Sequence, residues 1–169
     1  MRIATAVLED ALALLALRRA VLAEGCWFAT RVDEYAGDLE QARAAVHTLQ
    51  RQPNGTMLVA TRGGELLGML AVHGEGLTRM RHLGRMEMMV TADARGQGVG
   101  GALLDAGLVW AQSNTVLRKL SLAVFADNAA AVALYQRRGF VLEGRREGEY
   151  LLEDGTLRAD LLMARDVSG

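Results

Sequence analysis

The sequence contains one cysteine, Cys26, so no disulfide can form within the chain. It also has no apolar run near the roughly 18 residues that a membrane-spanning helix needs. Its first residues lack the basic and then apolar layout of a secretion signal. These absences disfavour a disulfide-stapled secreted protein and a membrane protein, and we expect a cytoplasmic protein with no membrane partner.

Neither sign of charge dominates the sequence. The 19 basic and 20 acidic residues give a formal net charge of -1, so no overall field attracts nucleic acid or an anionic surface. We therefore expect no nucleic-acid partner. His73 and His82 have no partner at metal-ligand spacing, so no metal site is expected either.

The size of the chain predicts one compact domain over residues 1–169. A chain of 169 residues that is 51% hydrophobic can bury roughly 70% of its unfolded surface. The sequence shows no repeat, low-complexity segment or long linker that would divide it.

Apolar patterning predicts helices and strands in mixed order. The expected helices are Asp10–Glu24, Asp33–Gln50, Ala102–Gln112 and Ala129–Arg138. The expected strands are Arg2–Val7, Met57–Thr61, Leu66–His73, Arg85–Thr91, Leu120–Phe125, Phe140–Tyr150 and Leu157–Arg165. Pro53-Asn54-Gly55 breaks the chain after the second helix, and Arg62-Gly63-Gly64-Glu65 is typical of a hairpin turn. This order predicts an α/β fold with a largely antiparallel sheet and helices packed on it.

A glycine-rich run between the strand residues Met86–Val90 and a helix is the most informative segment. Its residues are Arg95, Gly96, Gln97, Gly98, Val99, Gly100 and Gly101. Such a turn exposes backbone N–H groups at a helix start and lets a ligand approach closely, which suits the pyrophosphate of a nucleotide-containing cofactor. The planar fork of Arg95 also suits phosphate oxygens.

A dinucleotide site is one alternative for this run, because Gly96, Gly98 and Gly101 fit the pattern G-x-G-x-x-G. That reading requires an acidic residue about 20 residues further on, to hold the ribose. The closest acids are Asp105, inside the helix, and Asp127, beyond the next strand. The dinucleotide site is therefore disfavoured.

Two motifs resemble the GNAT superfamily of N-acetyltransferases. Arg95-x-x-Gly98-x-Gly100 matches the acetyl-CoA signature Q/R-x-x-G-x-G/A of that superfamily at every specified position. The second motif lies downstream and consists of Asn128, Tyr135, Gly139 and Phe140. The segment Asp154–Arg165 is similar to the last strand of bacterial members.

The resemblance implies a GNAT-like mixed sheet of about six to seven strands flanked by about four helices. It also implies acetyl-CoA as co-substrate and direct acetyl transfer to a primary amine, without a covalent enzyme intermediate. The expected partner is a small-molecule amine such as a free amino acid, and homodimers are common in the family.

The resemblance further implies roles for the cofactor-binding residues. The backbone of Met89 and Val90 would pair with the pantetheine arm like an added strand, and one N–H there would serve as the oxyanion hole. Asn128 corresponds to a cofactor-contacting asparagine. Asp127-Asn128 before an alanine run is also a good helix cap, and both roles can hold together.

Two catalytic roles follow from the same resemblance. Tyr135 takes the position of the general acid that protonates the departing thiolate, and the alternative is an aromatic side chain packed on a helix. Glu87 takes the position of a general base, and the alternative is a strand carboxylate paired with Arg85 or another cation. If Glu87 does not act as a base, α-amino substrates are favoured, because their amines deprotonate more easily than that of lysine.

Some assignments stay open at this point. Trp27, Phe28 and Tyr35 are candidates for the wall of the substrate pocket. Arg137-Arg138 and Arg145-Arg146 could contact the adenosine phosphate or could be solvated. The functional alternatives are an acetyltransferase acting on a protein or peptide amine, and a CoA-binding module without catalysis.

Overall fold

A computed structural model describes residues 1–168. Within them, seven strands form one sheet in the order β1-β2-β3-β4-β5-β7-β6, antiparallel throughout except for the β4–β5 pair. The strands are β1 (Arg2–Thr5), β2 (Thr56–Arg62), β3 (Glu65–Gly74), β4 (Leu83–Val90), β5 (Lys119–Phe125), β6 (Val141–Leu151) and β7 (Leu157–Asp166). The α/β, largely antiparallel fold predicted from the sequence is confirmed.

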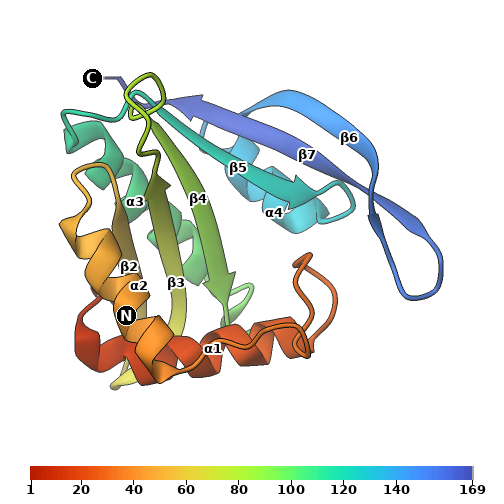
Figure 1. Ribbon diagram of the computed structural model, residues 1–169, viewed down its shortest axis with the longest axis horizontal. Coiled ribbons are helices and arrows are strands. Elements are labelled where there is room, and N and C mark those ends of the chain that lie inside the picture. Colours follow the sequence, from red (N-terminus) through yellow and green to blue (C-terminus); the bar gives the residue numbers. More distant parts are fainter. Residues whose placement is uncertain (169) are drawn as a thin grey trace.

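Four α-helices cover the two faces of the sheet among these residues (Figure 1). They are α1 (Ala11–Ala23), α2 (Leu39–Arg51), α3 (Val99–Ser113) and α4 (Ala129–Gln136). Because strand side chains alternate between faces, Leu70 and Val72 join a core with α3 and α4, whereas Met69 and Ala71 join a second core with α1 and α2. No helix within residues 1–168 is long and apolar enough to cross a membrane.

The sheet opens between its two parallel strands. β4 and β5 pair only where Leu83–Arg85 faces Lys119–Ser121. Beyond that point the strands diverge (Figure 1), while β4 stays paired with β3 to its end at Val90. One backbone edge of β4 therefore has no strand partner over its last residues.

Two helix starts differ from the prediction by more than one residue. The second helix begins at Leu39 and not at Asp33, because the Asp38 side chain accepts a hydrogen bond from the Gln41 N–H at 2.8 Å and the Gln41 side chain accepts one from the Asp38 N–H at 3.3 Å. This reciprocal cap fixes the helix start. The third helix begins at Val99 and not at Ala102, so its first turn contains two of the glycines.

Candidate active site

A cleft of about 1240 Å³ occupies the gap between β4 and β5. Its walls come from both faces of the sheet, with Tyr135 of α4 on one side and Val21 of α1 on the other. The glycine run lines one part of it, and Trp27, Phe28, Phe125, Tyr150 and Asp160 line another. We call these the cofactor end and the acceptor end, after the roles that the sequence predicts for them.

The free edge of β4 borders the middle of the cleft. The Thr91 N–H donates to the Leu67 carbonyl on the β3 side at 2.9 Å, and a Cβ on Gly68 of β3 would lie 2.6 Å from the carbonyl oxygen of Met89. Since backbone groups alternate along a strand, Met89 faces β3 whereas Met88 and Val90 face the cleft. Of the two residues expected to pair with pantetheine, only Val90 thus presents its backbone to the gap.

The glycine run forms the start of α3 at the cofactor end. Gly96 has φ +72° and Gly98, the N-cap, has φ +82°, a left-handed backbone that favours glycine. The first helical bond runs from the Ala102 N–H to the Gly98 carbonyl at 3.0 Å. The N–H groups of Val99, Gly100 and Gly101 precede it and have no partner within the helix, so this turn can bind an anion.

Side chains of the run are held by protein groups. The Gln97 side chain donates to the Asp93 carbonyl at 2.6 Å and accepts from Arg62 at 3.0 Å. The guanidinium of Arg95 donates to both carboxylate oxygens of Glu24, at 2.6 and 2.7 Å, and its Nε donates to the Val90 carbonyl at 3.1 Å. The side chain that we expected on a phosphate is thus engaged elsewhere.

Two further arginines line the cofactor end, Arg137 and Arg138. Arg138 donates to both oxygens of Asp105, at 2.6 and 3.0 Å, and these hydrogen bonds lower the pKa of the Asp105 carboxyl. Arg145 and Arg146 lie on β6, where Arg145 pairs with Glu147. The structure therefore puts the first arginine pair, and not the second, beside the turn.

Tyr135 lies in the wall of the cleft on α4 and is 7% exposed. Its ring packs on Phe140, with centroids 5.7 Å apart, and its hydroxyl has no hydrogen-bond partner among residues 1–168. Burial raises the pKa of Tyr135 to about 12, so the hydroxyl keeps its proton at neutral pH. Asn128 lines the cleft and caps α4, accepting from the Ala131 N–H at 3.2 Å.

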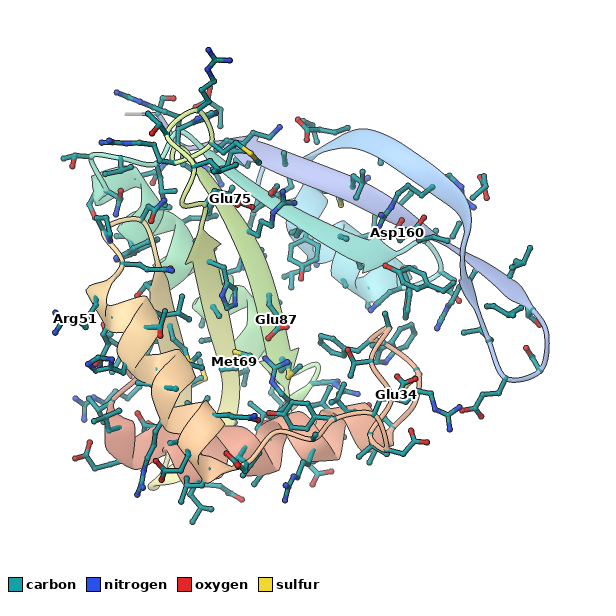
Figure 2. The ribbon with its side chains drawn as sticks, viewed as in Figure 1. Glu34, Arg51, Met69, Glu75, Glu87 and Asp160 are labelled. Atoms are coloured by element: carbon teal, nitrogen blue, oxygen red, sulfur yellow. The ribbon has the colours of Figure 1, made fainter. Side chains whose placement is uncertain are left out.

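Glu87 of β4 and Asp160 of β7 lie on opposite sides of the cleft (Figure 2). Each carboxylate has an arginine partner. Glu87 accepts hydrogen bonds from both terminal nitrogens of Arg18 on α1, and not from Arg85. Asp160, 1% exposed, accepts from Arg146 at 2.9 and 2.5 Å. The lone pairs of Glu87 are thus directed at least partly to Arg18.

Aromatic rings enclose the acceptor end. The Tyr150 hydroxyl lies 3.2 Å from the Asp160 carboxylate, and its ring meets Phe125 edge to face at 5.0 Å. Trp27 and Phe28 line the cleft from the loop after α1, as expected. Tyr35 instead lies against Arg18, 5.9 Å from the guanidinium carbon to the ring centroid.

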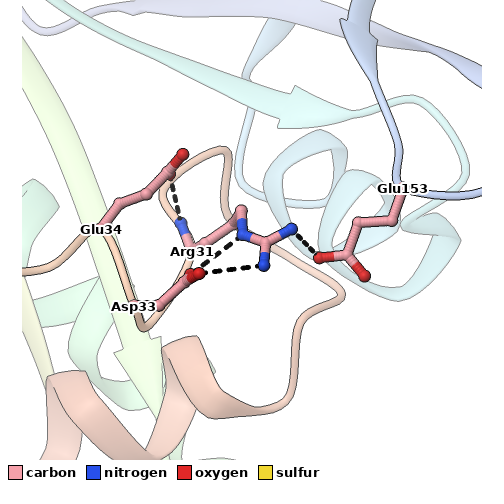
Figure 3. Close-up of polar contacts among 4 residues, drawn as sticks. All are labelled: Arg31, Asp33, Glu34 and Glu153. Atoms are coloured by element: carbon pink, nitrogen blue, oxygen red, sulfur yellow. Dashed lines mark hydrogen bonds and ion pairs between the residues drawn. The ribbon is translucent and has the colours of Figure 1, made fainter.

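The loop after α1 is joined to the β6–β7 side of the cleft. Arg31 binds Asp33 on its own loop and Glu153 on the turn between β6 and β7 (Figure 3). Arg158 of β7 donates to the Cys26 carbonyl at 2.6 Å, and its guanidinium carbon lies 5.4 Å from the centroid of the Trp27 ring. These contacts bridge the acceptor end.

Sequence reasoning missed several of these residues. Each of them contacts a side chain that belongs to another element of the fold. They are Arg18, Glu24, Phe125, Tyr150 and Asp160. Asp160 carried a signal, because it is an acidic residue inside the apolar strand Leu157–Arg165. Among residues 1–168, no three His, Cys, Asp or Glu side chains are grouped so that they could hold a metal ion.

Comparisons with known proteins agree with this geometry. Residues 4–140 match the family described as "Acetyltransferase (GNAT) family". The L-amino acid N-acetyltransferase AaaT of Escherichia coli K12 is 27% identical over 135 residues, which is 78% of this chain and 83% of that protein.

Solved structures share the whole fold. A ribosomal-protein-alanine N-acetyltransferase from Brucella melitensis superposes with a TM-score of 0.87 at 26% identity, covering 98% of this chain and 99% of that chain. The protein yncA of Salmonella typhimurium, solved with its cofactor acetyl-CoA, has a TM-score of 0.89 at 16% identity, covering 100% of this chain and 95% of that chain.

Proposed function

Since the chain belongs to the acetyltransferase (GNAT) family and is an acetyl-CoA-dependent N-acetyltransferase, we propose that its acceptor is the primary amine of a small metabolite such as a free amino acid. The observation that carries this proposal is the bridged acceptor end. The Arg31–Glu153 pair and the Arg158–Cys26 bond join the two walls across it. An acceptor end bounded in this way favours a small substrate over a folded protein.

Charge along the cleft supports the same assignment. The cofactor end has the free N–H groups of α3 and the cations Arg137 and Arg138, which suit the phosphates of acetyl-CoA. The carboxylates of Glu87 and Asp160 also line the cleft, but each is already paired with an arginine, Arg18 and Arg146. At the acceptor end it is therefore the aromatic rings that suit an approaching ammonium group.

In the proposed arrangement the thioester lies along the free edge of β4. The backbone of Met88 and Val90 pairs with the pantetheine arm as an added strand would. The Val90 N–H then donates to the thioester oxygen and stabilises the negative charge that develops there, a contribution of several kcal/mol in other acyl-transfer enzymes.

Proton movement must balance the reaction. The amine nitrogen forms a bond to the acetyl carbon, the carbon–sulfur bond breaks, and one proton leaves nitrogen while one reaches sulfur. Tyr135 is the proposed donor to sulfur. With its pKa raised to about 12 against about 8.5 for a thiol, full transfer costs about 5 kcal/mol, so we propose that its main contribution is a hydrogen bond to the developing thiolate.

The state of Glu87 bears on the acceptor. Because Arg18 engages its carboxylate, we propose that Glu87 acts through water or only by its charge. The α-amine of a peptide or an amino-acid amide, with a pKa near 7.8, costs about 1 kcal/mol to deprotonate at pH 7, whereas a lysine-like amine costs about 4–5 kcal/mol. The α-amine of a free amino acid lies between these two limits, because the neighbouring carboxylate stabilises its ammonium form. A site with a weak base therefore favours α-amines.

The test is thiol release from acetyl-CoA with a panel of free amino acids, their amides, short peptides, polyamines and aminoglycosides. We expect turnover of free amino acids and a fall in kcat of about 100-fold in Tyr135→Phe, with the acetyl-CoA affinity measured by calorimetry nearly unchanged. The hydroxyl has no hydrogen-bond partner among residues 1–168, so the variant should fold.

Other outcomes would replace the proposal. Turnover of peptides whose N-terminal residue is alanine, but not of free amino acids, would indicate a protein acceptor, as the name of the Brucella enzyme states for that protein. Tight acetyl-CoA binding without turnover of any amine would indicate a CoA-binding module.

A further inference from the structure

Arg95 connects two parts of the cleft that are 71 positions apart in the sequence. It belongs to the glycine run at the cofactor end, yet its guanidinium pairs with Glu24, the C-cap residue that follows α1. Its Nε donates to the Val90 carbonyl at 3.1 Å. The two parallel bonds to Glu24, at 2.6 and 2.7 Å, fix both distance and orientation, as is usual for an arginine–carboxylate fork.

Glu24 is also the last residue before the acceptor loop, which we define as residues 25–29. This loop begins with Gly25, whose φ is +66° and which has no atom within 4 Å of a hypothetical Cβ. Trp27, Phe28 and Ala29 of the loop line the cleft. The loop therefore starts at a permissive backbone position, directly after the carboxylate that Arg95 holds.

The ion pair contributes little to stability by itself. The side chains of Arg95 and Glu24 are 37% and 24% exposed, and pairs with this exposure are weak. Its consequence is positional, because it sets where the acceptor loop begins relative to the phosphate-binding turn.

We propose that the Glu24–Arg95 pair couples acetyl-CoA binding to acceptor binding, a step that rests on the proposed function. Phosphate binding fixes the glycine run, whose Gly96 and Gly98 have open space around them. Through Arg95 and Glu24, the fixed run holds the acceptor loop in the position that completes the acceptor end. Glu24 is thus a positioning residue, and by reciprocity the acceptor also strengthens acetyl-CoA binding.

The test is Glu24→Gln, which keeps the shape of the side chain and removes its charge. We expect the acetyl-CoA dissociation constant without acceptor to stay within about twofold and the KM of the acceptor to rise at least about fivefold, with little change in kcat. Arg95→Lys keeps the charge without the fork and should raise the same KM. Glu40→Gln breaks an exposed pair with Arg43 on α2, at 2.8 Å, and is the control that should change neither constant.

A second readout does not require turnover. In a Trp110→Phe background, Trp27 is the remaining tryptophan of the two in the sequence. We expect acetyl-CoA to reduce the quenching of Trp27 fluorescence by acrylamide when Glu24 is present, and to leave it unchanged in Glu24→Gln. Circular dichroism checks that each variant is folded.

The two readouts separate this inference from the proposed function. If no amine is acetylated but acetyl-CoA protects Trp27 only in the presence of Glu24, acetyl-CoA binding is coupled to the acceptor loop through this pair, and the acceptor assignment fails. Equal protection in both proteins, with an unchanged acceptor KM, would overturn the coupling. A loss of acetyl-CoA affinity in Glu24→Gln beyond about tenfold would also overturn it, because the pair would then belong to the cofactor site itself.

Discussion

Tyr135 illustrates how burial at a single residue sets chemistry. Tyr135 belongs to the core under α4 and also lines the cleft, so packing and the proposed proton role are compatible in one side chain. The two interpretations that the sequence left as alternatives are therefore compatible. The cost is a higher pKa, because a phenolate in this wall would lose its hydration.

A raised pKa predicts a specific loss of stability in alkaline solution. Tyr135 titrates at about 12 in the folded protein and near 10 when unfolded. The folded state therefore binds this proton more tightly, and its contribution is complete below pH 10 and is lost as the pH rises towards 12. The loss amounts to at most about 3 kcal/mol of unfolding free energy.

Denaturant unfolding at a series of pH values measures this loss, and tyrosinate absorbance follows the titration of the three tyrosines. Tyr135→Phe should remove the titration near pH 12 and flatten the fall in stability above pH 10. An unaltered fall in that variant would show that other groups cause it.

Individual pairings are the part of the site that the sequence could not provide. Glu87 could be chosen because it lies on the strand before the glycine run, but Arg18, its partner, is 69 positions away on α1. The same holds for Arg95 and Glu24. Such contacts depend on how helices settle on the sheet, which local pattern does not encode.

At the scale of elements, local signals placed helices and strands well and their boundaries less well. The capping box Asp38–Gln41 was present in the sequence, yet the acidic Asp33 was equally suited to begin a helix. In the structure Asp33 binds Arg31 instead, at 2.9 Å. The hairpin at Gly63-Gly64 was predictable because both residues need positive φ there, and they have +60° and +86°.

The start of α3 allows a test of why glycine is present in the run. Gly98→Ala should lower the unfolding free energy by about 1–2 kcal/mol, because its φ of +82° is left-handed and an L-residue is strained there. The variant should also weaken acetyl-CoA binding, because the N–H groups that have no partner within the helix, on Val99, Gly100 and Gly101, come directly after Gly98 in the chain. No atom lies within 4 Å of the added Cβ, so the effect is one of backbone conformation.

Gly76→Ala is the matched control. Gly76 also has no atom within 4 Å of an added Cβ but lacks a positive φ, so its stability should change by less than about 0.5 kcal/mol. Denaturant titration and calorimetry compare the two variants. Equal effects in both would remove the conformational argument for the run.

The divergence of β4 and β5 belongs to the scale of the whole molecule. Sequence pattern identified both strands and the turn that follows β4, and the family resemblance implied a mixed sheet. The two parallel strands pair over three positions only, Leu83–Arg85 on the β4 side, and then separate. The sequence pattern contains no information on where this separation begins. The cleft, its volume and its two chemically different ends are consequences of that parting.

Because the two cores share one sheet, we propose that the chain unfolds as one domain, and acetyl-CoA should stabilise it as a unit. At a free concentration 100 times its dissociation constant, a ligand adds about 2.7 kcal/mol to the unfolding free energy. For a chain of this length that corresponds to a rise in Tm of roughly 5–11 °C. Scanning calorimetry should give a single transition that moves in full with acetyl-CoA and moves less in Gly98→Ala. Two transitions, of which acetyl-CoA shifts only one, would instead mean that the faces of the sheet unfold separately and that the cleft joins two units.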